Sequence, residues 1–322
     1  MWISARRASA ILYNYLCSIP EPIKFLIPAN VCPIVLATFE KARIEYELVD
    51  IGEDNLCINA NLVEDFLKKE SESVGILYVR TFGYLEDIES WFQFLKSGYP
   101  GVRIIDDRCL CKPSFDESRF SRYCDLTLFS TGYSKYVELG FGGYAWINDE
   151  NGAEYKSNDA RFNEKDHEQL VSRFNHAINR RCLFEYEDSD WLDLKSLDYP
   201  STEYFDLVRS GLEFSDRHKK SLNRIYESSI PENYWLGIKF NDWRFSILVA
   251  NKEEVIKKIF DSGFFASSHY ASMVGIFRDG SAPEAQRVHN GIVNLFNDQR
   301  VSSEQAELIA NIVRKVSVPI ND

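Results

Sequence analysis

The sequence contains no run of about 18 consecutive apolar residues, so no segment is expected to cross a membrane as a helix. Basic residues are fewer than acidic ones, with 37 Lys and Arg against 49 Asp and Glu, and the formal net charge is −12. This balance argues against a general binder of nucleic acid or of anionic membranes. It still permits a local basic pocket for a phosphate group.

Cysteine patterns typical of metal or redox sites are also missing, because no CxxC pair occurs and no Cys and His residues have zinc spacing. The seven cysteines are irregularly spaced, which favours free thiols in a reducing cytoplasm. Cys109 and Cys111 form a CxC, which we interpret as two buried thiols rather than a metal or redox pair. We therefore predict a cytoplasmic protein with no metal site.

The N-terminal stretch MWISARRASAILYNYLC has two arginines before an apolar segment, as a signal peptide has, but no small-residue cleavage site follows. An amphipathic first helix at residues 6–17 is the preferred interpretation. The chain has 322 residues, 45% of them hydrophobic, which is enough for a large core divided between two lobes.

Strand and helix patterns alternate along the first half of the chain. Expected strands lie at 24–29, 44–51, 74–83, 102–107, 125–130 and 142–149, and further expected helices at 31–43, 60–70 and 87–97. This alternation predicts an α/β fold whose sheet is mainly parallel, with right-handed crossovers. Ligands of such sheets bind at the carboxyl ends of the strands. The residues expected there are Pro28–Asn30, Arg80–Gly83, Asp106–Asp107 and Ser130–Lys135.

The second half begins with a charged stretch, residues 150–200, that shows no clear periodicity. Beyond it, the pattern predicts a long helix at 203–227, a strand at 243–251, and helices at 252–264 and 302–316. These elements predict a smaller C-terminal α+β domain. We place the large domain at residues 1–205 and the small domain at residues 206–322.

The segment FSTGYSKYVELGFGGYAWI, residues 129–147, holds Lys135 between a hydroxyl-rich turn and a glycine cluster. A lysine amine in a pocket can form a Schiff base with an aldehyde cofactor, and a carboxylate can keep the cofactor's pyridine nitrogen protonated. Hydroxyls and backbone N–H groups near a helix start can hold its phosphate. Lys135, Asp107 and Ser130 fit these three roles. A surface lysine and an acid that caps a turn are the alternative interpretation.

Four segments, in their order and spacing, resemble the DegT-type sugar aminotransferases, which are fold-type I pyridoxal-phosphate enzymes. The segments are FLIPANVCPIVLATFEKARIEYELVDI, LYVRTFGYLEDI, VRIIDDRC and CDLTLFSTGYSKYVELGFGGYAWIND. The stretch WRFSILVANKEEVIKKIFDSGFFASSHYASM and the last helix are similar to the family's small domain. The resemblance covers most of the chain. It implies a fold-type I large domain with a mainly parallel sheet, a smaller C-terminal α+β domain, and bound pyridoxal 5'-phosphate.

The resemblance implies the roles of the acid pair and of the lysine. Lys135 resembles the lysine that forms the Schiff base with the cofactor. Asp107, second of the pair, resembles the partner of the pyridine nitrogen, and Asp106 is expected to be structural. Related dehydratases replace the lysine, so its presence favours transamination.

The resemblance also implies which residues contact the rest of the cofactor. Ser130 resembles the hydroxyl that binds the phosphate. Arg7, Ala8 and Ser9 lie where the family has a Gly-Thr turn that opens the first helix on the phosphate. Cys32 lies where many members stack an aromatic ring on the cofactor and where some members have cysteine.

The chain departs from the family pattern at several places. It begins almost at the phosphate turn, without the usual N-terminal arm, and it has no Gly-Thr at that turn. Leu110 stands where the family has His or Gln, three residues after the aspartate. After GGYAWIND, the Gly-Tyr-Asn-Tyr-Arg loop that normally reaches the neighbouring subunit's site is not recognisable. These departures put the binding of a nucleotide-linked sugar in doubt.

The preferred function is a pyridoxal-phosphate-dependent aminotransferase that moves an amine from a donor, glutamate, to a keto group on a nucleotide-linked sugar. We also expect a homodimer, because relatives share groups across the subunit boundary and the aromatic content is high, at 14%. Residues 150–200 are the candidate crossing segment, although the run RFNEKDHEQLVSRFNHAINRR could equally be a solvated amphipathic helix. The alternatives are a non-catalytic or regulatory relative on the same fold, and an unrelated α/β protein with a surface lysine.

Three aromatic positions have two interpretations each. His269 and Tyr270 lie in SSHYASM, which matches a His-Tyr segment of the family's small domain. They could contact the substrate or form an exposed loop pair. Tyr133 could cover the site, but packing is the preferred interpretation.

Arg80 is expected at the end of a strand, where it could meet an anionic substrate. The preferred interpretation is a salt bridge to Asp87 or Glu86.

Overall fold

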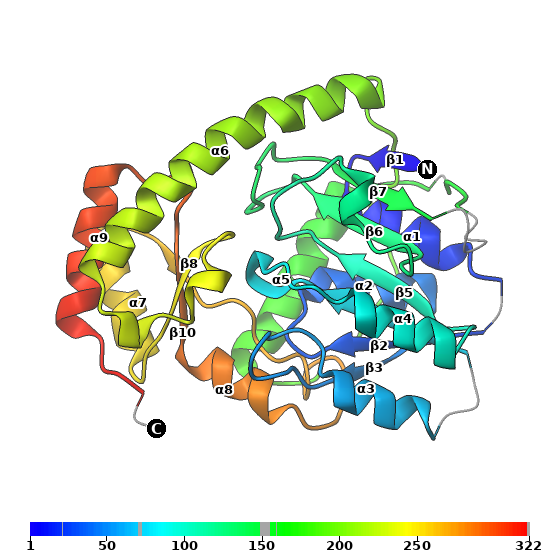
Figure 1. The fold of residues 1–322 in the computed structure, drawn as a ribbon, viewed down its shortest axis with the longest axis horizontal. Helices are drawn as coiled ribbons and strands as arrows, with labels where there is room; N and C mark the ends of the chain where they lie inside the picture. The colour runs from blue at the N-terminus through cyan, green and yellow to red at the C-terminus, as the bar shows by residue number, and fades with distance from the viewer. Residues whose placement is uncertain (21, 70–72, 149–154, 159, 321–322) are drawn as a thin grey trace.

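The computed structural model describes residues 1–20, 22–69, 73–148, 155–158 and 160–320. Two units are apparent in Figure 1, one built on a seven-stranded sheet and the other on a three-stranded sheet. In the described part of the chain, no helix combines the length and the apolar character needed to cross a membrane.

The large sheet has the strand order β1-β7-β6-β5-β4-β2-β3. The four pairings among β2 to β6 are parallel, whereas β7 pairs antiparallel with both β6 and β1. The prediction of a mainly parallel sheet is therefore confirmed. The strands are β1 (Trp2–Ala5), β2 (Lys24–Pro28), β3 (Glu45–Val49), β4 (Val74–Val79), β5 (Arg103–Asp107), β6 (Leu126–Ser130) and β7 (Gly143–Ile147).

Helices cover both faces of this sheet, because neighbouring residues of the central strands point to opposite sides. Ile27, Leu77 and Ile105 pack in one apolar cluster with helices α1, α2 and α5. The residues that precede them in the three strands pack in a second cluster with α3 and α4. The helices are α1 (Ala8–Cys17), α2 (Pro33–Ala42), α3 (Ala60–Leu67), α4 (Glu89–Gly98) and α5 (Glu164–Arg180).

Helix α5 corrects the expectation of an irregular stretch at residues 150–200. Asn163 caps its start by accepting a hydrogen bond from the Lys165 N–H, at 3.0 Å. Leu170, Phe174 and Ala177 form a narrow buried stripe, which the partly buried Val171 and Ile178 flank, and the opposite face is polar. The structure thus agrees with the alternative interpretation of an amphipathic helix, but the apolar stripe of the helix is buried in the core of this chain rather than solvated. Residues 149–154 and 159 lie outside the described residues.

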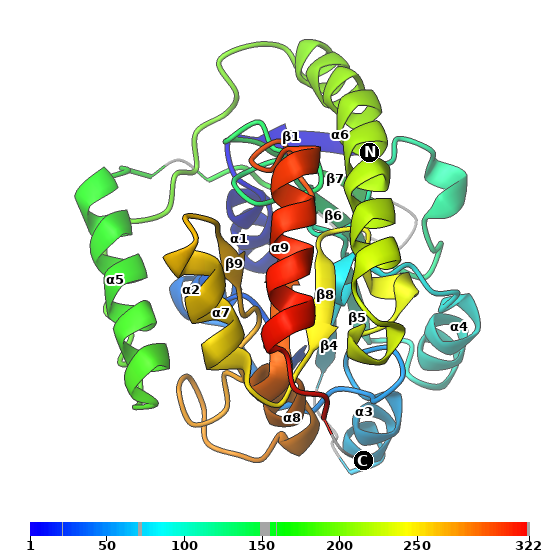
Figure 2. The same ribbon diagram turned by 90° about the vertical axis from the view of Figure 1, so that its left-hand side faces the viewer.

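The small unit has the antiparallel strand order β8-β10-β9, and α6 and α9 lie side by side beside it (Figure 2). The Ser302 side chain and Gln305 form a capping box at the start of α9, where the sequence predicts one helix to begin. The strands are β8 (Phe245–Leu248), β9 (Ala266–Ser267) and β10 (Ile292–Leu295). The helices are α6 (Ser201–Ser229), α7 (Lys252–Asp261), α8 (Pro283–Gly291) and α9 (Ser303–Val316). Short 3-10 helices are η1 (Thr81–Gly83), η2 (Glu117–Arg119), η4 (Glu232–Tyr234) and η5 (Ile238–Phe240).

Helix α6 belongs to both units (Figure 1). Near its start, Tyr204 and Val208 pack in a cluster that contains residues of β6 and β7. Near its end, Leu222 and Tyr226 pack with the strands of the small sheet. The predicted boundary between residues 205 and 206 falls inside this helix, so the division into two domains at that point stays a prediction.

Candidate active site

A cavity of about 290 Å³ lies at the carboxyl ends of the parallel strands. Its lining includes Val79 at the end of β4, Asp107 at the end of β5 and Ser130 at the end of β6. The six residues that the sequence assigns to the cofactor all line this cavity: Ala8, Ser9, Cys32, Asp107, Ser130 and Lys135. The structure therefore brings them together, whereas their roles remain predictions.

The cavity floor follows from strand pairing. Strands β5 and β6 are parallel neighbours, with Asp107 opposite Leu128, so Asp107 and Ser130 lie at the same edge of the sheet. The chain then turns, and Lys135 enters the cavity from the segment between β6 and β7. Among the described residues, no hydrogen bond or ion pair is formed by the Lys135 ammonium. The amine is thus available to a ligand.

The start of α1 lies against β7 because of two glycines. A Cβ on Gly143 would lie 2.5 Å from the Cα of Ala8, and Gly142 donates its N–H to the Arg6 carbonyl at 2.7 Å. This close approach brings the N-terminus of α1, with Ala8 and Ser9, to the wall of the cavity. No acidic side chain occurs in the first turn of α1, so its N–H groups can donate hydrogen bonds to an anion.

Arg7 adds a positive charge at the same place. It lines the cavity, and within the described residues its guanidinium has no ion-pair partner. Arg6 differs, because it pairs with Asp198 and lies 3.7 Å from Asp193. Of the two arginines, Arg7 is therefore the one available to an anion in the cavity.

Asp107 is buried, and its side chain accepts the Cys109 N–H at 2.8 Å. Burial raises the pKa of the Asp107 carboxyl above its ordinary value, although the Cys109 hydrogen bonds and the charge of Lys135 act in the opposite direction. A cation placed beside this carboxyl would favour its ionised form. The site therefore suits a ligand that carries a positive charge near Asp107.

Asp106 does not line the cavity, in agreement with the prediction that it is structural. It accepts hydrogen bonds from Arg80 at 2.8 and 3.2 Å and from Arg108 at 2.8 Å. Burial alone would raise the pKa of Asp106, but the charges of Arg80 and Arg108 hold it below its ordinary value. A salt bridge was the preferred interpretation of Arg80, but the predicted partners were wrong. Glu86 contributes only its carbonyl oxygen, at 2.9 Å.

The small unit reaches the cavity through Tyr270. Its ring stacks on Trp243 with centroids 5.9 Å apart, and burial raises the pKa of its hydroxyl well above the ordinary value. His269 is exposed and is not part of the cavity wall. Thus Tyr270 fits the interpretation of a substrate contact, and His269 fits the alternative of an exposed loop residue.

Tyr133 corrects another expectation. Packing was the preferred interpretation, yet the residue is 70% exposed and lies at the cavity. Its ring lies over Gly140, where a Cβ would be 3.6 Å from the Tyr133 ring, so the residue lies at the surface of the turn rather than in the core.

Helix α5 supplies a wall that sequence reasoning missed. His167, Val171 and Phe174 all line the cavity. The spacing of these residues, four and then three, is the signal that could have identified the helix. Burial and the charge of Arg7 lower the pKa of His167, so its imidazole is neutral near pH 7. Leu110, the departure after the aspartate, is a further apolar wall residue.

Comparison with protein-family models finds no match, and comparison with curated protein sequences finds none either. Solved structures with a similar fold are numerous. Spr1654 from Streptococcus pneumoniae, described as a sugar aminotransferase, superposes in its PLP form with a TM-score of 0.70 and 16% identity, covering 98% of this chain and 86% of that one. PseC from Helicobacter pylori, an aminotransferase of pseudoaminic acid biosynthesis, has a TM-score of 0.70 and 14% identity over 98% and 86%.

A DegT DnrJ EryC1 StrS aminotransferase from Brucella abortus has a TM-score of 0.67 and 16% identity, over 98% of this chain and 85% of that one. At these identities the likeness establishes the fold. The chain has the fold of fold-type I aminotransferases, as the sequence predicts.

Proposed function

We propose that the protein is a pyridoxal-phosphate-dependent aminotransferase that passes an amine from glutamate to a keto group on a nucleotide-linked sugar. The observation that carries the proposal is the pairing, in one cavity, of the unpartnered Lys135 amine with the buried Asp107 carboxyl. The similar structures support it. Spr1654 is known in PLP and PMP forms, and DesI was solved in the presence of its TDP-sugar product.

The residues of the cavity fit the cofactor at each of its charged or reactive ends. Lys135 offers an amine to the aldehyde, and Asp107 offers a carboxylate to the pyridinium nitrogen. For the phosphate, the cavity offers the hydroxyls of Ser130 and Ser9, the N–H groups at the start of α1 and the charge of Arg7. A volume of about 290 Å³ is near the lower end for small-molecule pockets. Cys32 borders the same space, and burial raises its thiol pKa, so the sulfur stays neutral.

When bound, the cofactor supplies an electron sink for the bonds of the substrate α-carbon. The protein supplies proton transfer and charge. Lys135 would act as the general acid and base that carries the proton from the substrate α-carbon to the bound cofactor. Asp107 would keep the ring nitrogen protonated, which requires that its own carboxyl is ionised in the loaded protein. The apolar wall formed by Leu110, Val171 and Phe174 keeps water away from these groups.

A non-catalytic relative remains the second candidate, and Leu110 is the observation that favours it. This side chain is 4% exposed and apolar, and it lines the cavity where the family has a polar residue. Such a protein would bind the cofactor or a sugar ligand without turnover. We further propose that the protein is a homodimer of the cytoplasm, on the basis of the family resemblance and the thiol content.

Absorbance spectroscopy and chemical trapping test the proposal. Purified protein incubated with pyridoxal phosphate should absorb near the visible edge, and borohydride should attach the cofactor covalently to the peptide that contains Lys135. Addition of glutamate before borohydride should convert the spectrum and prevent the attachment. Lys135→Met should abolish attachment, and the matched variant Lys112→Met should not. A label on a peptide without Lys135 would refute the site, and a loaded protein unchanged by any amino donor would favour the non-catalytic relative.

A further inference from the structure

Ser134, the residue directly before Lys135, has a left-handed backbone with φ of +59°. Residues with a Cβ adopt this conformation rarely, because the Cβ crowds the neighbouring carbonyl oxygen. Such a conformation persists where the surroundings hold it in place. The direction in which Lys135 leaves the turn therefore depends on what holds Ser134.

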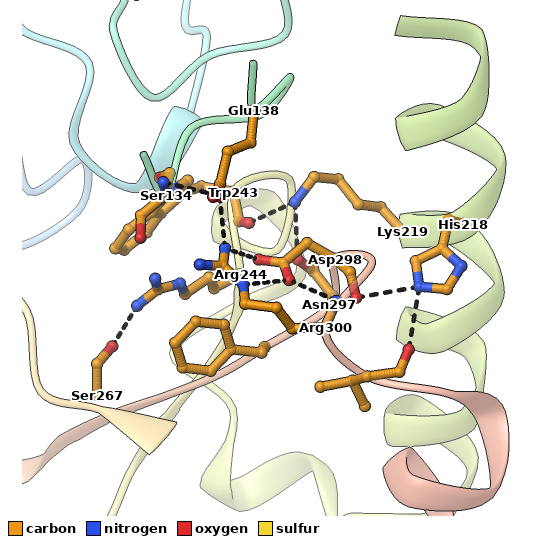
Figure 3. Close-up of polar contacts among 12 residues, drawn as sticks. Ser134, Glu138, His218, Lys219, Trp243, Arg244, Ser267, Asn297, Asp298 and Arg300 are labelled. Atoms are coloured by element: carbon orange, nitrogen blue, oxygen red, sulfur yellow. Dashed lines mark hydrogen bonds and ion pairs between the residues drawn. The ribbon is translucent and has the colours of Figure 1, made fainter. Parts of the chain in front are cut away.

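Two side chains, Glu138 and Trp243, bond to the backbone of Ser134 (Figure 3). Its N–H donates to the Glu138 carboxylate at 2.8 Å, and its carbonyl accepts the indole N–H of Trp243 at 2.6 Å. Glu138 belongs to the same turn, whereas Trp243 comes from the small unit, just before β8. Both backbone polar groups of the residue are thus occupied.

The Glu138 carboxylate is itself held by the small unit. Its Oε2 also accepts a hydrogen bond from Arg300 at 2.8 Å. Arg300 is oriented by Asp298, to which it donates through Nε at 2.8 Å and Nη2 at 2.5 Å. These contacts appear as a connected chain of dashed lines in Figure 3. Asp298 and Arg300 lie in the loop between β10 and α9.

Helix α6 contacts both Trp243 and the loop that carries Asp298 and Arg300. Lys219 is 2% exposed, and its amine donates to the Trp243 carbonyl at 2.8 Å and to Asn297 at 2.8 Å. His218, the residue before it, has Nε2 3.1 Å from the carbonyl oxygen of Asp298. The tryptophan and the arginine loop are therefore fixed by adjacent residues of one helix.

We propose that Trp243 and Arg300, which act through Ser134 and Glu138, are positioning residues for Lys135. We call Glu138, Trp243, Asp298 and Arg300 the Ser134 latch. The inference rests on the proposed role of Lys135 and extends it, since a lysine that must reach two atoms of a bound cofactor needs a defined origin. The latch gives the small unit control over the reactive amine of the large unit, although none of its four residues lines the cavity.

Two variants each remove one of the contacts that the small unit makes with this turn, and each has a matched control variant elsewhere in the small unit. Trp243→Phe deletes the indole donor, and its control is Trp235→Phe, where the indole donates to the Ile230 carbonyl at 3.0 Å. Arg300→Met deletes the ion pairs of Arg300 with Glu138 and Asp298. Its control is Arg287→Met, because Arg287 bonds Glu284 through the same two nitrogens at 2.8 and 2.5 Å.

The first measurement needs no cofactor. Hydrogen exchange of the peptide that covers residues 131–139 should become roughly tenfold faster in Trp243→Phe and in Arg300→Met, because one anchoring hydrogen bond is lost in each. Both controls should exchange at the wild-type rate in this peptide. Unchanged exchange in both latch variants would overturn the proposal.

The second measurement follows the attachment of pyridoxal phosphate to Lys135. The aldehyde condenses with the amine with loss of water, and cyanoborohydride then reduces the product to a stable link. The attachment rate should fall roughly tenfold in the latch variants and stay within about twofold in the controls. Wild-type rates in both latch variants would refute the positioning role.

The two measurements test the proposed function and the positioning role of the latch separately. A wild-type protein that attaches no cofactor at Lys135 would refute the proposed function, and the exchange result would still decide whether the latch holds the turn. If Arg300→Met does not fold, Glu138→Gln replaces it, because the amide keeps an acceptor for Ser134 and loses the charge that Arg300 needs. Intermediate changes in exchange and attachment are expected for this variant, and wild-type values in both would overturn the proposal.

Discussion

Asp106 and Asp107 are adjacent in β5, yet the two carboxyl groups lie in opposite environments. Asp106 bonds Arg80 and Arg108, which hold its pKa low, whereas burial raises the pKa of Asp107. The difference follows from the strand geometry, since consecutive side chains point to opposite faces. One acid is thus committed to the fold, and the other is available to a ligand.

The first prediction contrasts these two acids. Asp106→Asn should lower the free energy of unfolding by about 3–5 kcal/mol, because two buried guanidinium groups lose their counter-charge. Asp107→Asn should unfold near the wild-type midpoint but slow the half-reaction with glutamate by roughly 10- to 100-fold, the equivalent of one charge-assisted hydrogen bond. Denaturant titration and stopped-flow absorbance measure the two effects. Comparable half-reaction rates in Asp107→Asn and the wild type would contradict the assigned role.

The second prediction concerns the two consecutive arginines. Arg7→Met should weaken the binding of pyridoxal phosphate by about tenfold or more, through loss of a charge-assisted contact to the phosphate. It should leave the binding of pyridoxal, which has no phosphate, nearly unchanged. Arg6→Met serves as the control, because Arg6 already pairs with Asp198. Equal losses for both ligands would show that Arg7 does not meet the phosphate.

The third prediction is a pH dependence that arises from Lys219. Burial lowers its pKa from 10.5 to about 8 in the folded protein. Between these pH values the unfolded chain binds more protons, so the free energy of unfolding rises with pH, by up to about 1.4 kcal/mol per pH unit from this group. Lys219→Met should remove that increment in urea titrations between pH 8 and 10. The exposed neighbour variant Lys220→Met should retain it, and identical pH slopes in all three proteins would contradict the prediction.

The fourth prediction is the oligomeric state. Light scattering should give a mass near twice the chain mass of 37.3 kDa over a wide range of concentration. A concentration-independent mass near that of one chain would refute the homodimer. Because α5 lines the cavity of its own chain, a cross-link from α5 to Lys135 would support residues 150–200 as the crossing segment only if it joined two differently labelled chains.

Local patterns predicted the ends of β2, β5 and β6 to within one residue, because each carries a buried apolar run that stops near a polar residue. The acids of β5 and the turn after β6 are examples, and their convergence follows from parallel pairing alone. The predicted end of β4 was wrong, since the strand stops at Val79 and a 3-10 helix occupies Thr81–Gly83. Elements without such runs were missed. Strand β9 has two residues, and β1 has four, so pairing partners distant in the sequence define them.

The wall of the cavity and the latch were beyond sequence reasoning for a different reason. Val171 and Phe174 are surrounded by polar and charged residues in α5. The helical spacing of the apolar residues therefore rests on only a few positions and is easily overlooked. Trp243 and Ser134 are separated by more than a hundred residues, and a hydrogen bond between an indole and a backbone carbonyl leaves no periodic signal. Such contacts depend on how the two units dock, which local propensity does not specify.

Helix α6 has a consequence for how the chain unfolds. Tyr204 and Leu222 are embedded in the separate apolar clusters of the two units, although they are parts of one continuous helix. Melting of either cluster removes the packing that stabilises its half of the helix, and helices in water depend on such packing. The two units should therefore unfold as a single cooperative transition, and a fragment cut at residue 205 should be a poor folding unit. The two sheets should therefore not unfold independently, although they have separate apolar clusters.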